Sequence, residues 1–261
     1  MWLIENAPAA EVLASPYGQL NATLDGAAYY QGKQAYEKQL KQDPKNLKIL
    51  ENAANYFLIN DRALAKESLQ AAQALDRENP EWPAALGHLY MLDMNSNSLK
   101  VQDEAATNAL EQLEIAYKLS TDRAQNNLLQ YLAKAAVAAK QTEKAKKYAE
   151  KMVRQSGSGW NAGNNIHQGN ITLGKVALAA GDVEAAKQYL IKAGKTSGSP
   201  TLNFFGPDMT LAKELLQKDE KAKDVVLEYL TLCSKFWKLG KVRLDQWSAI
   251  VKDDQIPSDW R

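Results

Sequence analysis

Residues 173–190 have the sequence LGKVALAAGDVEAAKQYL, and this stretch decides the fold. Apolar residues recur every three or four positions on each side of Gly181-Asp182, which is the spacing of amphipathic helices. A glycine followed by an aspartate is typical of a point where one helix ends and the next is capped. The stretch therefore predicts two helices joined by a tight turn.

The same arrangement recurs along the chain, and strand-like alternation is nearly absent. In each predicted pair the second helix carries a small residue followed four positions later by another apolar residue. These positions are Gly32/Tyr36, Ala65/Leu69, Ala109/Leu113, Ala145/Ala149 and Ala186/Leu190. Their spacings fit a period of about 34 residues with insertions in the loops 94–99 and 157–170. The sequence therefore predicts an all-α chain of repeated helix pairs.

These motifs resemble the tetratricopeptide repeat family, whose first helix carries W-x₂-L-G-x₂-Y and whose second carries A-x₃-F. Leu86-Gly87-x-x-Tyr90 reproduces the centre of the first motif. Leu173-Gly174-x-x-Ala177, followed by Ala186-x₃-Leu190, forms the best complete copy. The resemblance implies a right-handed α-solenoid of helix pairs with a concave surface.

The predicted organisation has three parts. Residues 1–26 form an N-terminal segment, and residues 27–194 form about five tetratricopeptide-like helix pairs. Residues 195–261 depart from the repeat pattern and are predicted to be an atypical helical cap, because terminal repeats must cover the end of the core. Within this cap we expect helices at about 208–218 and 221–238, with Trp237 buried.

Composition excludes several classes of protein. The 32 basic and 31 acidic residues among 261 give a net charge of +1, which predicts no binding to nucleic acid. Cys233 has no second cysteine to form a disulfide or a thiolate metal site with. No apolar run approaches the roughly 18 residues of a membrane-spanning helix. The N-terminus lacks the pattern of a signal peptide, so we expect the cytoplasm, with a trimmed leader as the open alternative.

Catalysis has little support in the sequence. His88 and His167 are the only histidines, and neither has an acidic residue or second histidine one turn away. We therefore expect no catalytic residues, no metal and no cofactor. An enzyme with a site near the 157–170 loop and His167 remains an alternative.

The resemblance to tetratricopeptide repeats implies where a ligand binds, because the first helix of each pair lines the concave surface in that family. Carried onto this chain, the expected binding residues are Leu50, Phe57, His88, Asn127, Gln130, Lys134, Gln168, Ile171 and Lys175. We expect an extended peptide of another protein, with apolar side chains toward Leu50 and Phe57 and a carboxylate near Lys134 and Lys175. The lysine-and-asparagine clamp of chaperone-binding members is not reproduced.

The sequence thus predicts a non-catalytic protein–protein interaction module that binds a partner segment in a solenoid groove. A scaffold that self-associates through its C-terminal helices is the alternative from a different class. The oligomeric state stays open.

Overall fold

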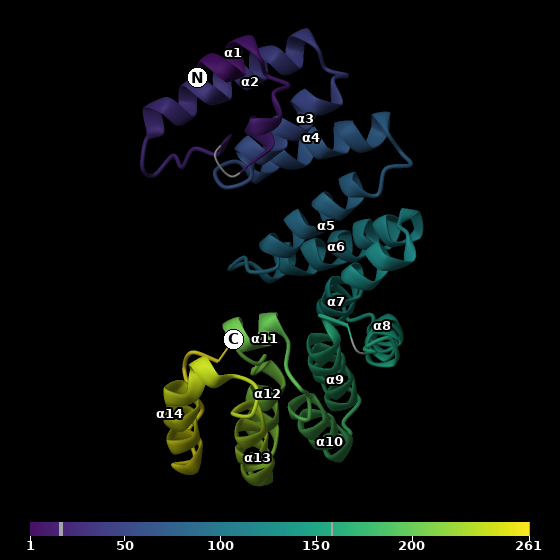
Figure 1. The fold of residues 1–261 in the computed structure, drawn as a ribbon, viewed down its shortest axis with the longest axis vertical. Helices are drawn as coiled ribbons and strands as arrows, with labels where there is room; N and C mark the ends of the chain where they lie inside the picture. Colours follow the sequence, from purple (N-terminus) through teal and green to yellow (C-terminus); the bar gives the residue numbers. More distant parts are fainter. Residues whose placement is uncertain (16–17, 158, 261) are drawn as a thin grey trace. The chain divides into compact units, whose positions relative to one another are not determined.

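Helices make up all the regular secondary structure in residues 1–15, 18–157 and 159–260, the part of the chain that the computed structural model describes (Figure 1). No strand occurs in these residues, so the all-α prediction is confirmed. None of the helices in these ranges combines the length and apolar content needed to span a lipid bilayer.

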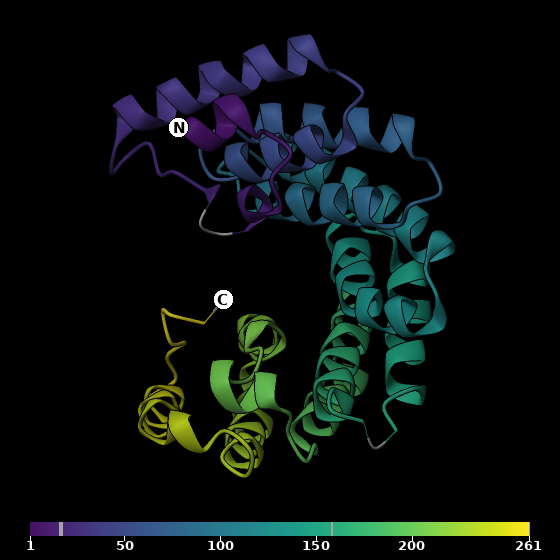
Figure 2. The same cartoon turned by 45° about the horizontal axis from the view of Figure 1, so that its top comes forward.

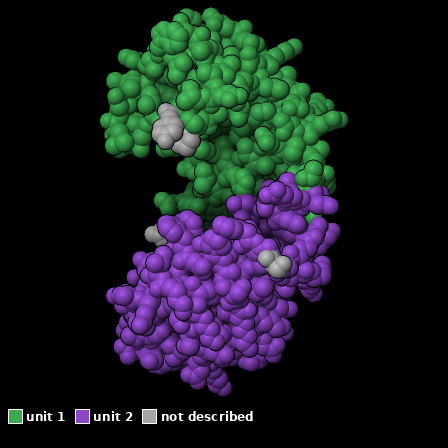
Figure 3. Space-filling view, viewed as in Figure 1, with its two compact units in different colours: residues 1–121 green, residues 122–261 purple. Residues whose placement is uncertain are grey.

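The chain divides into two units, Met1–Thr121 and Asp122–Arg261 (Figure 3). The division falls inside the predicted repeat region and not at residues 26 or 194. Residues 1–26 lie in the first unit and residues 195–261 in the second.

The first unit begins with a short helix and a 3₁₀ turn. Three longer helices follow, and then a further helix pair. Its elements are α1 (Trp2–Asn6), η1 (Glu11–Ala14), α2 (Gly26–Gln42), α3 (Leu47–Phe57), α4 (Arg62–Leu75), α5 (Glu81–Asp93) and α6 (Leu99–Leu119). Helices α3 and α4 pack side by side, as do α5 and α6 (Figure 2). The 3₁₀ turn η1 lies against α3, and α1 lies against α2.

Local sequence explains where helices of the first unit begin. Asp25, Asn46 and Asp61 each accept a hydrogen bond from a main-chain N–H of the first turn that follows. The core beside these helices is rich in tyrosine: the rings of Tyr29 and Tyr56 stack with centroids 5.4 Å apart. The Tyr56 hydroxyl donates to the carbonyl oxygen of Tyr29, at 2.8 Å, so α2 and α3 are joined by both contacts.

The second unit begins with two helix pairs and ends with shorter helices. Its elements are α7 (Asp122–Ala138), α8 (Thr142–Arg154), α9 (Ala162–Ala179), α10 (Val183–Gly194), α11 (Pro200–Phe205), α12 (Thr210–Lys218), η3 (Glu220–Ala222), α13 (Lys223–Cys233), η4 (Lys238–Gly240) and α14 (Lys241–Lys252). The turn between α9 and α10 is the predicted one. Gly181 has a positive φ of 84°, and Asp182 caps α10 by accepting from the N–H of Ala185.

The C-terminal helices differ in detail from the prediction. Helix α11 precedes the first helix expected in the cap, and α12 begins at Thr210, within two residues of the expected start at about 208. The next helix, α13, ends at Cys233, so Trp237 lies outside it. Trp237 is nevertheless buried, as predicted. Gly206 and Gly240 allow this burial, because a Cβ at either position would approach the indole ring to 2.7 and 2.1 Å.

Candidate functional site

The predicted binding residues of the first unit do not present a groove. Leu50 and Phe57 are 3% and 1% exposed and belong to the same hydrophobic core as Ile4 and Leu13. The Phe57 ring packs edge-on against Tyr36 of α2, with centroids 6.1 Å apart. These two positions therefore support the fold from inside and cannot contact a ligand in this conformation.

His88, the third predicted residue of the first unit, lies partly buried on α5. Burial lowers the pKa of its imidazole. The neutral ring is therefore favoured near pH 7.

The six predicted residues of the second unit lie in three different environments. Asn127 and Lys134 are exposed on α7, and Gln168 is partly exposed on α9. Ile171 is buried in the hydrophobic core. Gln130 and Lys175 each have a partner within the unit.

Gln130 and Lys175 contact other helices of the second unit. The Gln130 Oε1 atom accepts a hydrogen bond from Asn164 Nδ2, at 3.0 Å, which joins α7 to α9. Lys175 Nζ lies 3.3 Å from Glu214 Oε1 of α12. A carboxylate does face Lys175, as the sequence predicted for a ligand, but it belongs to the chain's own C-terminal helices.

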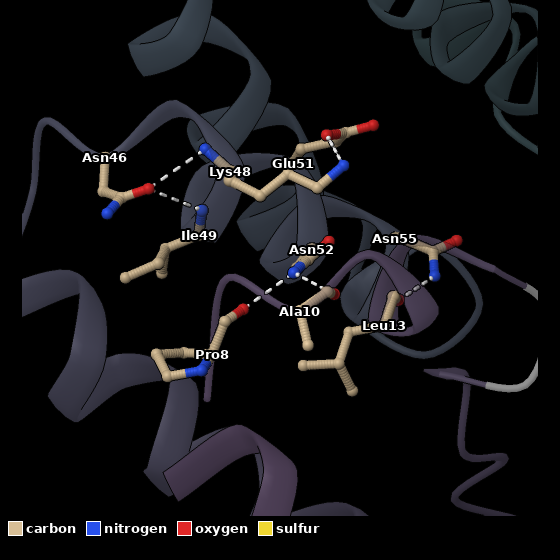
Figure 4. A network of polar contacts seen from close by, with 9 residues as sticks. All are labelled: Pro8, Ala10, Leu13, Asn46, Lys48, Ile49, Glu51, Asn52 and Asn55. Atoms are coloured by element: carbon tan, nitrogen blue, oxygen red, sulfur yellow. Dashed lines mark hydrogen bonds and ion pairs between the residues drawn. The ribbon is translucent and has the colours of Figure 1, made fainter. Parts of the chain in front are cut away.

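Asparagines of α3 and of the turn after it form a set of hydrogen bonds with the N-terminal segment of the first unit. We call Asn52, Asn55 and Asn60 the asparagine face. Asn52 Nδ2 donates to the carbonyl oxygens of Pro8 and Ala10, at 2.7 and 3.0 Å (Figure 4). One amide thus binds two main-chain carbonyls that are two residues apart.

Asn55 repeats this geometry one helical turn later. Its Nδ2 atom donates to the carbonyl oxygens of Leu13 and Ser15, at 2.8 and 3.0 Å. Its Oδ1 atom accepts from the side chain of Gln19, at 2.8 Å. Residues three apart share one side of a helix, so Asn52 and Asn55 both point toward the N-terminal segment (Figure 4).

Asn60 completes the asparagine face from the turn between α3 and α4. Its Nδ2 atom donates to the carbonyl oxygen of Leu20, at 2.6 Å, and its Oδ1 atom accepts from the N–H of Ala22, at 2.9 Å. The three amides together contact five carbonyl oxygens and one N–H of the main chain. Apart from the Gln19 contact, these bonds involve main-chain atoms, so they would form with many different sequences.

An apolar anchor accompanies these polar contacts. Leu13 of η1, whose carbonyl oxygen Asn55 binds, has its side chain buried in the core of the first unit. Asn52 is fully buried, and within the described residues its Oδ1 atom has no hydrogen-bond partner. Burying an oxygen that accepts no hydrogen bond costs free energy. The two hydrogen bonds that the Asn52 amide nitrogen donates offset part of that cost.

Sequence reasoning missed the asparagine face. The only signal was the asparagines themselves, at positions 52, 55 and 60 of a segment whose apolar residues dominated the prediction. Their partners lie 36 to 44 residues earlier, in a segment that carries no motif.

The second unit places His167 where it cannot act on a substrate. The imidazole is fully buried, and both ring nitrogens form hydrogen bonds with main-chain groups, of Ala193 and Asp208. In residues 1–15, 18–157 and 159–260, no group of three or more His, Cys, Asp or Glu residues is arranged to hold a metal ion. An enzyme with a site near the 157–170 loop stays an untested alternative.

Comparisons with known proteins do not assign this chain to a family. No protein-family model matches this chain, and no curated protein matches it in sequence.

Proposed function

We propose that this chain is a non-catalytic protein-interaction module whose helix pairs are tetratricopeptide-like repeats stacked in the right-handed sense. Its asparagine face binds a peptide segment of another protein through that segment's main chain. The observation that carries the proposal is the occupancy of this face by residues 8–22 of the chain itself, of which 8–15 and 18–22 are described.

The geometry defines the kind of peptide that fits. One pair of carbonyl oxygens, at 8/10, precedes the 3₁₀ turn η1, and the second pair, at 13/15, lies at its end. A suitable ligand presents these two pairs together with one apolar side chain at the position of Leu13. It needs no charge at this face, unlike the carboxylate expected near Lys134 and Lys175, which stays a separate prediction.

Asparagine is well suited to this role. Its amide nitrogen provides two donors and its oxygen accepts, so one short side chain can bind both kinds of main-chain group. Each bond contributes about 0.5–1.5 kcal/mol, and five of them with a buried leucine are enough for specific but reversible binding.

A fragment-exchange experiment tests the proposal. Leu24 is 86% exposed in the turn before α2, so a specific protease site inserted there should be cleaved in the folded protein. The released N-terminal fragment is then exchanged for a fluorescent synthetic copy, and its dissociation constant is measured. We expect saturable rebinding by the folded remainder of the chain.

Two variants make the result specific. The double variant Asn52→Ala with Asn55→Ala removes four of the main-chain contacts and should weaken rebinding at least tenfold. Asn126→Ala, an exposed asparagine of α7, should leave it unchanged. Equal binding by the double variant, or failure of the fragment to rebind a remainder that circular dichroism shows to be folded, would refute the proposal.

A further inference from the structure

The second unit carries a second, independent surface that the proposed peptide site does not use. Four large apolar side chains of α11, η4 and α14 stand out from the protein: Phe204, Phe205, Leu239 and Val242 are 69%, 76%, 78% and 70% exposed. We call these four residues the apolar patch. Exposed groups of this kind commonly mark an interaction site.

The four residues form one surface. The rings of Phe204 and Phe205 meet edge-to-face, with centroids 4.9 Å apart. Phe204 and Leu239 line the same shallow cavity of about 260 Å³. Val242 follows Leu239 by three residues, at the start of α14. The patch thus takes residues from α11, from η4 across the cavity, and from the first turn of α14.

The patch is held on a rigid base. Leu202, Phe236 and Trp237 lie buried beneath it. Gly206 and Gly240, at the ends of α11 and η4, both pack directly on the Trp237 ring. Phe205 and Leu239 each precede one of these glycines. Because the glycines pack on the Trp237 ring, the main chain is fixed there and the side chains of Phe205 and Leu239 point away from the core.

Positive charge surrounds the patch. Residues 195–207 contain one lysine, Lys195, and no acidic residue, while residues 234–243 contain Lys235, Lys238, Lys241 and Arg243 and no acidic residue. All four lysines are exposed, and within the described part of the chain none forms an ion pair. Arg243 is different, because it lies 3.9 Å from Asp259. The nearest acidic residues along the sequence are Asp208 and Asp245.

Apolar side chains that project from a rigid base and are flanked by exposed lysines match the chemistry of an anionic lipid surface. The apolar groups enter the boundary between headgroups and acyl chains, and the lysines contact the negative headgroups. A protein partner would have to supply a matching hollow for each projecting side chain, whereas a bilayer deforms around them. We propose that the apolar patch docks this chain on the surface of an anionic membrane.

Vesicle co-sedimentation of the full chain tests this proposal. We expect binding to vesicles of phosphatidylcholine and phosphatidylserine at about three to one, and at least tenfold weaker binding to phosphatidylcholine alone. Binding to the anionic vesicles should decrease when the salt concentration is raised from about 0.1 M to about 0.5 M.

Two pairs of variants distinguish binding through the apolar patch from nonspecific binding to vesicles. Phe204→Ser with Leu239→Ser should lose at least tenfold in binding, whereas Leu24→Ser with Leu99→Ser, which removes equally exposed leucines of the first unit, should not. Lys235→Glu with Lys241→Glu should abolish the preference for anionic vesicles, whereas Lys146→Glu with Lys147→Glu on α8 should retain it. These side chains are exposed, and circular dichroism checks that each variant is folded.

Four results would overturn the proposal. The first is equal binding to neutral and anionic vesicles, and the second is unchanged binding by both patch variants. The third is the absence of vesicle binding while light scattering detects a dimer that Phe204→Ser with Leu239→Ser dissociates. In that case the patch joins two copies of this chain. Capture of acidic peptides without vesicle binding would equally replace the lipid surface by a protein partner.

Discussion

His167 accepts a hydrogen bond at Nε2 from the main-chain N–H of Asp208, at 3.0 Å. Because an N–H can only donate, Nε2 must be unprotonated, and the ring proton lies on Nδ1, 3.1 Å from the carbonyl oxygen of Ala193. The ring also stacks near Tyr229 of α13. One neutral imidazole thus connects α9, the end of α10 and the segment that leads into α12.

The pH dependence of stability should reflect this histidine. Burial lowers the pKa of His167, although the Asp208 carboxylate and the Ala193 bond oppose the shift. The unfolded chain therefore binds a proton more readily than the folded one below about pH 6.5, and stability should fall as the pH decreases through that range. Urea unfolding of the wild type should give a lower midpoint at pH 5 than at pH 7.5.

The variant His167→Gln isolates this effect. It should be less stable than the wild type at pH 7.5 but lose less of its stability on acidification. His88→Gln is the matched comparison, because burial also lowers the pKa of His88, which lies in the first unit. A His167→Gln protein whose midpoint falls with pH as steeply as that of the wild type would contradict this interpretation.

Replacing glycine by alanine should lower the stability of the protein at one position of α2 but not at another. A Cβ at Gly32 would lie 2.0 Å from the Tyr56 hydroxyl oxygen, while a Cβ at Gly26 meets nothing within 4 Å. Gly32→Ala should therefore cost about 1–3 kcal/mol through overpacking. Gly26→Ala should cost nothing, since alanine favours the helix. Thermal unfolding of both variants measures the contrast, and equal melting temperatures would show that α2 can move away from α3.

Two tryptophans of the second unit provide a similar comparison. Trp237 is buried and its ring lies 5.7 Å from that of Trp247, whereas Trp160 is 80% exposed. Trp237→Ala should lower the free energy of unfolding by about 3–5 kcal/mol. Trp160→Ala should change it by less than about 0.5 kcal/mol. An unchanged melting temperature for Trp237→Ala would mean that α11 and η4 do not depend on this ring.

The thiol of Cys233 should be unreactive in the folded protein. Burial raises its pKa to about 12, although a hydrogen bond with Tyr229 acts in the opposite direction. The thiolate is the reactive form, so a disulfide reagent at pH 8 should label the protein only after denaturant is added. Rapid labelling of one thiol per chain without denaturant would show that α13 opens readily.

The helix pairs could be predicted because they depend on local signals. Gly181 and Asp182 end one helix and cap the next, and the apolar spacing on either side is fixed by the helix itself. Helix α11 and the 3₁₀ turns could not be predicted in the same way. They are too short to show a period, and packing on residues such as Trp237 decides their course.

The candidate site was harder to predict, for a different physical reason. The resemblance to tetratricopeptide repeats indicates which side of α3 would face a ligand, but not which part of the chain already covers it. Leu50 and Phe57 are buried within one core with Ile4 and Leu13, more than 30 residues earlier in the sequence. Contacts over such separations depend on the tertiary structure. They produce no periodic pattern in the amino-acid sequence. Lys175 is a similar case, since its partner Glu214 lies in the predicted cap.

The covalent link between the asparagine face and residues 8–22 sets a threshold for any competing ligand. A tethered segment is present at an effective local concentration in the millimolar range when its linker is short and flexible. Under the proposed function, a free peptide with the same intrinsic affinity must approach that concentration before it displaces the segment. At micromolar concentrations a weak ligand would therefore not displace the segment from the intact chain. After a single cut in the exposed turn at Leu24, the same ligand would bind to the asparagine face.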